Sequence, residues 1–295
     1  MQSSAALSIG LPVVLCIVML GLGLSLKLDD FRRVLHQPRA VLIGLFCQIV
    51  ILPVICFGLT LVSGLPPAIA VGMMLLAASP GGTSATLYTH LARGDVALSI
   101  TLTALTSALS VITVPVIANF ALVQFYGQAA VVYLELSQVG QIFVIAVVPA
   151  LVGVLIQSRY PALAQRLERP VKMLATLFLA AFVIFALVSQ WGLVVTWGAT
   201  IATVVLPFNL ISFAVGYFVP RLFRIEYKQA IALAMSIGMH NAALVIAVAL
   251  SEQMLDNAEM AIPPAAYGLV AYITGGLLVW VLNRRQAVPV KSSPG

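Results

Sequence analysis

Charged residues are scarce in this chain, and acidic ones are the scarcest. Its 295 residues include 15 Lys and Arg against 9 Asp and Glu, while 62% are hydrophobic. So little polar surface excludes a soluble domain of this size and indicates an integral membrane protein with lipid around it. The net charge of +6 does not indicate nucleic acid as a partner, because the basic residues are spread over short segments.

Cysteines and catalytic groups are equally few. Cys16, Cys47 and Cys56 lie in apolar runs without paired spacing, which predicts neither a disulfide framework nor a zinc site. The middle of these runs contains His240 and no Lys, Arg, Asp or Glu. An intramembrane enzyme needs a nucleophile, a base or a metal cluster, so we expect no enzyme. A receptor would bring a signalling domain, and a channel remains an alternative.

The apolar runs are long enough to cross a membrane and predict nine transmembrane helices in one domain, residues 1–295. They cover 7–26, 40–62, 65–91, 96–123, 136–156, 173–188, 194–219, 230–250 and 262–282. With this assignment, every Lys and Arg falls in an odd-numbered connection or in the C-terminal tail. Cytoplasmic loops are the ones enriched in Lys and Arg. We therefore expect a plasma (inner) membrane protein with an outer N-terminus, a cytoplasmic C-terminus and an uncleaved first span.

Two short matches indicate an internal repeat. Residues 52–53 and 206–207 both read Leu-Pro, and Ala-Ile-Ala-Val at 68–71 matches Ala-Ile-Ala-Leu at 230–233. Helices one to four (7–123) then correspond to helices six to nine (173–282), and helix five (136–156) is unpaired. Because five helices separate equivalent positions, the second copy has the opposite orientation. Such inverted repeats are typical of secondary transporters, whose sites form near the bilayer midplane.

The third and eighth predicted helices are interrupted in the middle, by Ser79 to Thr83 and by Ser236 to Asn241. Proline lacks an amide donor and glycine tolerates open backbone, so each run is expected to unwind. Freed backbone groups are tolerated at this depth only when buried in protein or lining a cavity. A kink that adjusts packing is the alternative. We predict a substrate site that includes Pro80, Gly81, Gly82, Thr83, Asn209, His240 and Asn241.

Other polar residues lie on neighbouring helices. Ser99, Thr103, Thr106, Ser110 and Thr113 follow one helical face; we expect Ser99 and Thr103 to contact a ligand and the others to join helices. For Gln48 and Asn209, ligation and bonding between helices are both open. His240 is either a neutral hydrogen-bonding group or a proton carrier.

These residues resemble the bile acid:sodium symporter family, in a nine-helix bacterial form. The resemblance rests on Pro-Gly-Gly-Thr at 80–83 with LARGDVALS at 91–99, on MLGLGLSL at 19–26 followed by Asp-Phe at 30–31, and on Gly-Met-His-Asn at 238–241. It extends from about Met19 to Asn283. It implies a core domain of helices two, three, four, seven, eight and nine with crossing broken helices, a panel domain of the other three, and organic anions such as bile acids and pantoate as substrates.

The resemblance also implies two sodium sites that draw on Gln48, Ala85, Thr86, Ser99, Thr103 and the break from Ser236 to His240. The family's second break usually reads Glu-x-Gly-x-Gln-Asn, whereas residues 236–241 read Ser-Ile-Gly-Met-His-Asn. Ala85 and Thr86 likewise replace a serine and an asparagine. A hard cation prefers anionic oxygens. We therefore expect no cofactor beyond one weak sodium site formed from Gln48, Thr86, Ser99, Thr103, Ser236, Ile237, Met239 and His240.

The sequence thus predicts a secondary transporter of a small organic anion that works by alternating access. Half-helix N-termini at the breaks can stabilise an anion without a buried Lys or Arg. Proton coupling through His240 and uncoupled transport are the alternatives to weak sodium coupling.

Overall fold

A computed structural model describes residues 16–17, 20–21, 23–24, 37–82, 84–127, 148–149, 151–189, 191–251 and 254–287. These residues are mainly helical, and their one β-type pairing is an isolated bridge between Gly81 and His240. The named elements are α3 (Pro38–Phe46), the π-helical turn η2 (Cys47–Ile51), α4 (Leu52–Val62), α5 (Pro67–Ala78), α6 (Ser84–Leu91), α7 (Val96–Tyr126), α9 (Pro161–Ser189), α10 (Trp191–Leu222), α11 (Tyr227–Gly238), α12 (Ala242–Leu250), the 3-10 turn η3 (Glu259–Ala261) and α13 (Ile262–Ala287).

Several helix boundaries follow from local chemistry. α3 and α5 begin at prolines, because the first position of a helix needs no amide donor. Asp95 caps α7 by accepting a hydrogen bond from the Leu98 amide at 3.0 Å. Asn241 caps α12 in the same way, accepting from the Leu244 amide at 3.1 Å. Pro38–Val62 is one continuous helical stretch through η2.

The described residues include helices in most of the predicted ranges. Most of the first and most of the fifth lie outside the described residues, although 151–159 are helical. α9 begins at Pro161 rather than at 173, because the Ala, Leu, Gln, Arg and Glu residues before Met173 favour a helix. Arg166 and Arg169, expected in a loop, are therefore helical.

Among the described residues, three helices are long and apolar enough to cross a membrane: Pro38–Val62, Val195–Leu222 and Glu259–Arg284. A fourth span is present if the halves of α7, Val96–Ser110 and Ile112–Tyr126, are taken together across their 55° bend. Pro115 lies inside α7 and cannot bond back to the carbonyl of residue 111, which accounts for a bend there. The chain is thus an all-α membrane protein in its described part.

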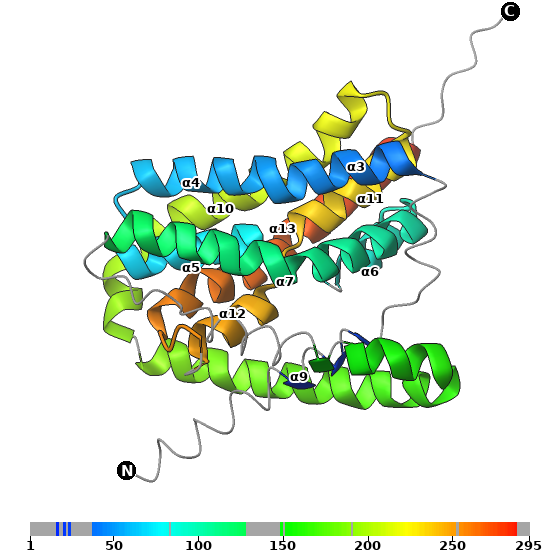
Figure 1. The fold of residues 1–295 in the computed structure, drawn as a ribbon. Coiled ribbons are helices and arrows are strands. Elements are labelled where there is room, and N and C mark those ends of the chain that lie inside the picture. The colour runs from blue at the N-terminus through cyan, green and yellow to red at the C-terminus, as the bar shows by residue number, and fades with distance from the viewer. Residues whose placement is uncertain are drawn as a thin grey trace, which may run out of the picture.

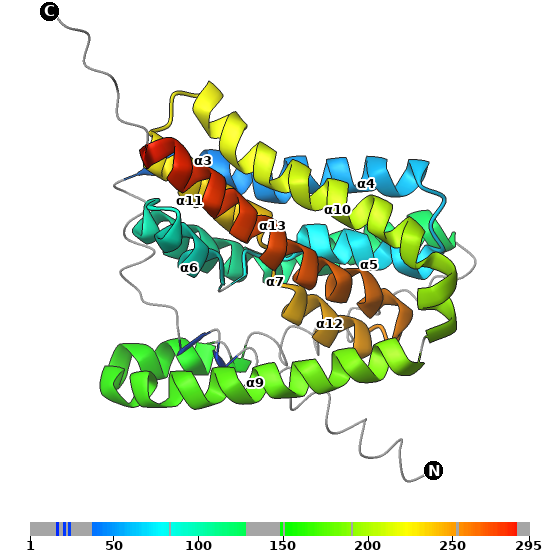
Figure 2. The same ribbon diagram turned by 180° about the vertical axis from the view of Figure 1, so that it is seen from behind.

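The helices form a layered bundle (Figures 1 and 2). α3 and α4 run along one edge and α9 along the opposite edge, with the broken pairs α5–α6 and α11–α12 between them. α6 packs with α11, and α5 with α12, on the two sides of the breaks. Both breaks therefore lie in the middle of the molecule, where the bundle is thickest.

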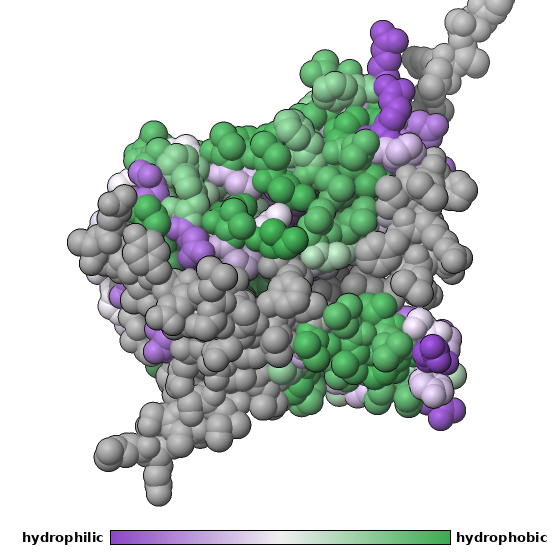
Figure 3. Space-filling view, in the orientation of Figure 1, coloured by the Kyte–Doolittle hydropathy of each residue, from purple (hydrophilic) through white to green (hydrophobic). Residues whose placement is uncertain are grey.

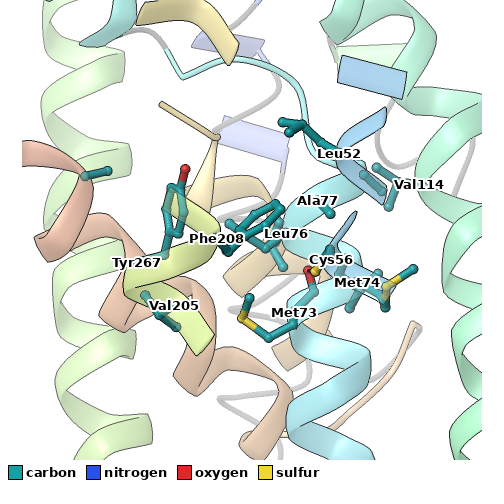
Figure 4. Packing of buried hydrophobic residues seen from close by; sticks show 14 of the residues in the cluster. Leu52, Cys56, Met73, Met74, Leu76, Ala77, Val114, Val205, Phe208 and Tyr267 are labelled. Atoms are coloured by element: carbon teal, nitrogen blue, oxygen red, sulfur yellow. Dashed lines mark hydrogen bonds between the residues drawn. The ribbon is translucent and has the colours of Figure 1, made fainter. Parts of the chain in front are cut away.

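On the face seen in Figure 3, the described surface is largely apolar, and hydrophilic residues gather toward the ends of the helices. Exposed side chains on α3, η2 and α4 recur at steps of four and include Leu42, Phe46, Val50 and Val54. This spacing makes one helical face that suits lipid. The interior is packed with apolar side chains as well; Figure 4 shows Phe208 and Tyr267 beside Leu76 within it.

Candidate functional site

The two helix breaks pair with each other. Residues 79–82 follow α5, and residues 239–241 follow α11. The Gly82 amide donates to the Met239 carbonyl, and the Asn241 amide donates to the Pro80 carbonyl at 2.9 Å. Each break therefore satisfies backbone groups that the other leaves free, which is what buried non-helical backbone requires within a membrane.

Two glycines permit this close approach. A Cβ atom at Gly81 would lie 2.8 Å from the Ser236 carbonyl oxygen. One at Gly82 would lie 3.2 Å from the carbonyl oxygens of both Met239 and His240. These neighbours are backbone atoms, which cannot move aside as a flexible side chain can. The pairing of the breaks therefore requires glycine at positions 81 and 82.

The pairing brings two helix N-termini, those of α6 and α12, to the middle of the bundle (Figure 1). Unpaired amides at a helix N-terminus carry partial positive charge and attract anions. The middle of the described spans supplies no full charge of its own, since their Lys and Arg lie near the ends, as Arg39, Arg221, Lys228 and Arg284 do. Helix ends are therefore the main source of positive potential at the breaks.

Hydroxyl groups from α7 line the first break. Ser99 and Ser236 are buried, and their hydroxyl oxygens are 2.9 Å apart. Thr103 Oγ1 is buried with no hydrogen-bond partner among the described residues, and it lies 3.3 Å from where a Gly81 Cβ would stand. The Gly81 amide donates to Thr106 Oγ1 at 3.4 Å. Thr106 had been expected only to join helices.

His240 lies in an aromatic setting that its neighbours in sequence do not indicate. Its ring stacks on Phe208 with centroids 5.5 Å apart, and the Tyr267 ring meets it edge-on at 5.4 Å. Gln48 Nε2 donates to the Ser79 carbonyl at 3.0 Å and lies 3.3 Å from His240 Nδ1. Nδ1 also lies 3.4 Å from the Ser79 carbonyl, so it accepts from Gln48 in one tautomer and donates to Ser79 in the other.

Asn209 is fully buried behind the second break. Its Nδ2 donates to the Gly238 carbonyl at 3.1 Å, and its Oδ1 accepts from the Thr274 hydroxyl. The Tyr267 hydroxyl donates to the same Gly238 carbonyl at 2.7 Å. Asn209 thus bonds between helices, one of the two roles left open for it, and its direct contact with substrate stays a prediction. Sequence reasoning missed Phe208, Tyr267 and Thr274, because aromatic residues and threonines are ordinary in membrane spans.

The other predicted residues are placed as follows. Pro80, Gly81, Gly82 and Asn241 form the paired breaks, and Thr83 lies outside the described residues. The second break is shorter than predicted, because α11 stays helical through Gly238; Ile237 is buried in its last turn, and Met239 is buried just after it. Ala85 is fully buried at the start of α6. Thr86 is half-buried one position further along α6.

The oxygens near the breaks carry no formal charge in the described residues. They are hydroxyl, amide and carbonyl oxygens, all neutral, and two of them, on Ser99 and Ser236, already bond to each other. No group of three or more His, Cys, Asp or Glu residues suited to a metal occurs in the described part of the chain. Without a carboxylate, a sodium ion would meet no full counter-charge.

Comparison with known proteins gives consistent relatives. The chain is 26% identical to the "Uncharacterized sodium-dependent transporter YocS" of Bacillus subtilis over 92% of its own length and 83% of that protein. It is 26% identical to "Probable sodium/metabolite cotransporter BASS1, chloroplastic" of Arabidopsis thaliana, covering 92% of this chain and 66% of the relative. It is 23% identical to the "Ileal sodium/bile acid cotransporter" of Oryctolagus cuniculus, covering 82% and 69%.

These relatives are named as transporters or cotransporters, not as enzymes. A family model described as "Sodium Bile acid symporter family" matches residues 12–197, which is more than half of the 295 residues. The resemblance drawn from the break motifs is thereby confirmed, and the chain belongs to the sodium bile acid symporter family.

Proposed function

We propose that this protein is a secondary transporter of a small organic anion, bile-acid-like or pantoate-like, and works by alternating access. The observation that carries the proposal is the pairing of two broken helices, which brings the N-termini of α6 and α12 together in mid-bundle. Such paired half-helices are a recurrent way of binding anions in carriers. We further propose nine spans, an inverted repeat of 7–123 and 173–282, and separate core and panel domains.

The proposed substrate contacts come from both breaks: Pro80, Gly81, Gly82 and Thr83 from the first, and His240 and Asn241 from the second. The dipoles of α6 and α12 attract the anionic group. The apolar surroundings suit the rest of an organic acid. Alternating access then exposes the breaks first on one side and then on the other.

Sodium coupling in this proposal is weak. The candidate ligands are Gln48, Thr86, Ser99, Thr103, Ser236, Ile237, Met239 and His240, and none of them carries a carboxylate. The bond between Ser99 and Ser236 joins α7 directly to α11, so this contact does not depend on an ion. A second candidate is coupling to protons through His240, favoured by the Ser79 carbonyl 3.4 Å from Nδ1, which can accept from a protonated ring.

The test is uptake into proteoliposomes containing the purified chain. Taurocholate, pantoate and a panel of other organic acids would each be offered with and without sodium and with and without a proton gradient. We expect saturable uptake of at least one organic anion, with a sodium effect below about tenfold. Discrete single-channel currents in planar bilayers would instead indicate a channel, and absence of saturable uptake across the panel would contradict the proposal.

A further inference from the structure

The carbonyl of Gly238, the last residue of α11, receives two hydrogen bonds from side chains of other helices. Asn209 Nδ2 on α10 donates at 3.1 Å, and the Tyr267 hydroxyl on α13 donates at 2.7 Å. We propose that Asn209 and Tyr267 are positioning residues, which jointly fix this carbonyl and thereby set the shape of the second break. This inference rests on the proposed function in one respect: it takes the two breaks to be the substrate site.

The carbonyl needs these donors because α11 ends there. The last four carbonyls of a helix have no partner within the helix. Gly238 is buried in the middle of the protein, where water cannot serve. A buried acceptor without a donor costs more than an ordinary hydrogen bond contributes, so side chains from α10 and α13 replace the missing helical amide.

The orientation of the Asn209 amide is determined by its two neighbours. A carbonyl can only accept, so the amide nitrogen must face Gly238. Oδ1 then faces the Thr274 hydroxyl, which donates to it. Asn209, Tyr267 and Thr274, here named the Gly238 clamp, thus connect α10, α11 and α13 through one carbonyl. Nδ2 and Oδ1 of Asn209 each keep one unused hydrogen-bonding position.

The first break is held by the same device. Gln48, from the helix preceding α5, donates to the carbonyl of Ser79, the C-cap residue directly after α5. Asn209 lies in α10, which precedes α11, and donates to the carbonyl that ends α11. In both cases, a carboxamide from the preceding helix holds the carbonyl at the end of the first half-helix. Because the same arrangement occurs at both breaks, we infer that each broken helix needs a side-chain donor for the carbonyl at its break.

The clamp acts directly on the site. Gly238 is followed by Met239, whose carbonyl accepts the Gly82 amide of the first break. His240 comes next, and its ring meets the Tyr267 ring edge-on. Moving the Gly238 carbonyl would therefore displace the backbone pairing and the imidazole together.

Hydrogen–deuterium exchange of the full chain in nanodiscs, without substrate, tests the proposal. The variants are Asn209→Ala, Tyr267→Phe and both combined; Thr274 retains the Val270 carbonyl as an acceptor. The matched controls are Tyr217→Phe on α10 and the buried Thr60→Val on α4, whose hydroxyl bonds only within its own helix. Because one donor still satisfies the carbonyl, each single variant should raise exchange at residues 239–245 by no more than about threefold, and the double variant by at least about tenfold.

The rise should extend to residues 82–85 and leave α3 and α4 unchanged. Exchange unaltered at the breaks, or raised equally throughout the protein, would overturn the proposal, as would control variants with the same effect. Should the double variant fail to insert, Asn209→Leu combined with Tyr267→Phe removes the same two donors while keeping side chains of similar size. The exchange experiment uses no substrate. Its failure therefore does not contradict transport, and failure of the uptake assay does not contradict the role of the Gly238 clamp.

Discussion

The residue that most separates this chain from the pattern expected for its family is Ser236. It is buried, and its hydroxyl bonds to Ser99 where a carboxylate was expected. Replacing sodium by choline should therefore change the apparent substrate affinity by less than tenfold, about 1.4 kcal/mol. The measurement is the concentration dependence of proteoliposome uptake in the two salts.

Ser236→Glu should introduce sodium dependence, because it restores an anionic oxygen beside Ser99 and the unpaired Thr103 hydroxyl. We expect the salt exchange to change affinity by more than about tenfold in this variant. Ser236→Gln, similar in size but neutral, is the control and should behave like the wild type. An equal response to sodium in all three proteins would refute the role assigned to the carboxylate.

His240 provides the second test at this scale. As a neutral ligand, it should be replaceable by Gln, which retains a donor and an acceptor. We expect His240→Gln to keep at least about a third of wild-type uptake and to show the wild-type profile from about pH 5 to 8. If His240 instead carries a coupling proton, wild-type uptake rises as pH falls, and the variant lacks that rise. Uptake of one substrate by both proteins across this range distinguishes the two roles.

At the scale of elements, the glycines of the first break make a direct prediction. Gly81→Leu with Gly82→Leu should reduce uptake by at least about tenfold, since both positions face backbone of the second break. Gly58→Leu in α4 and Gly276→Leu in α13 are the controls, because a Cβ at either position meets nothing within 4 Å. Membrane insertion is measured in parallel. Normal uptake by the inserted double variant would mean that the breaks are not the site.

The breaks themselves were predictable, because Pro80, Gly81 and the polar residues 236–241 interrupt otherwise apolar runs. Their pairing was not, since hydrogen bonds between residues about 160 positions apart leave no local pattern. The same holds for Phe208 and Tyr267, whose contacts with His240 depend on how α10 and α13 pack. The early start of α9 was missed for a different reason: hydropathy identifies the apolar part of a helix, and α9 extends beyond it.

For the whole molecule, the distribution of Lys and Arg predicts which loops face the cytoplasm. In a background with Cys16, Cys47 and Cys56 replaced by Ala, Ser63→Cys, after α4, should react with a membrane-impermeant maleimide on intact cells. Lys228→Cys, at the start of α11, should react only after the cells are permeabilised. The opposite pattern would invert the proposed orientation, and labelling of both positions from outside would rule out the predicted number of spans between them.

The lack of formal charge in the middle of the spans has an electrical consequence. An empty carrier whose moving parts carry no charge does no work against the membrane potential when it changes conformation. The bound anion is then the only charge displaced, at about 2.3 kcal/mol per elementary charge for each 100 mV. With a negative cell interior and no coupling ion, this energy opposes entry of a monovalent anion and favours its exit, so the potential alone would make the proposed carrier an exporter.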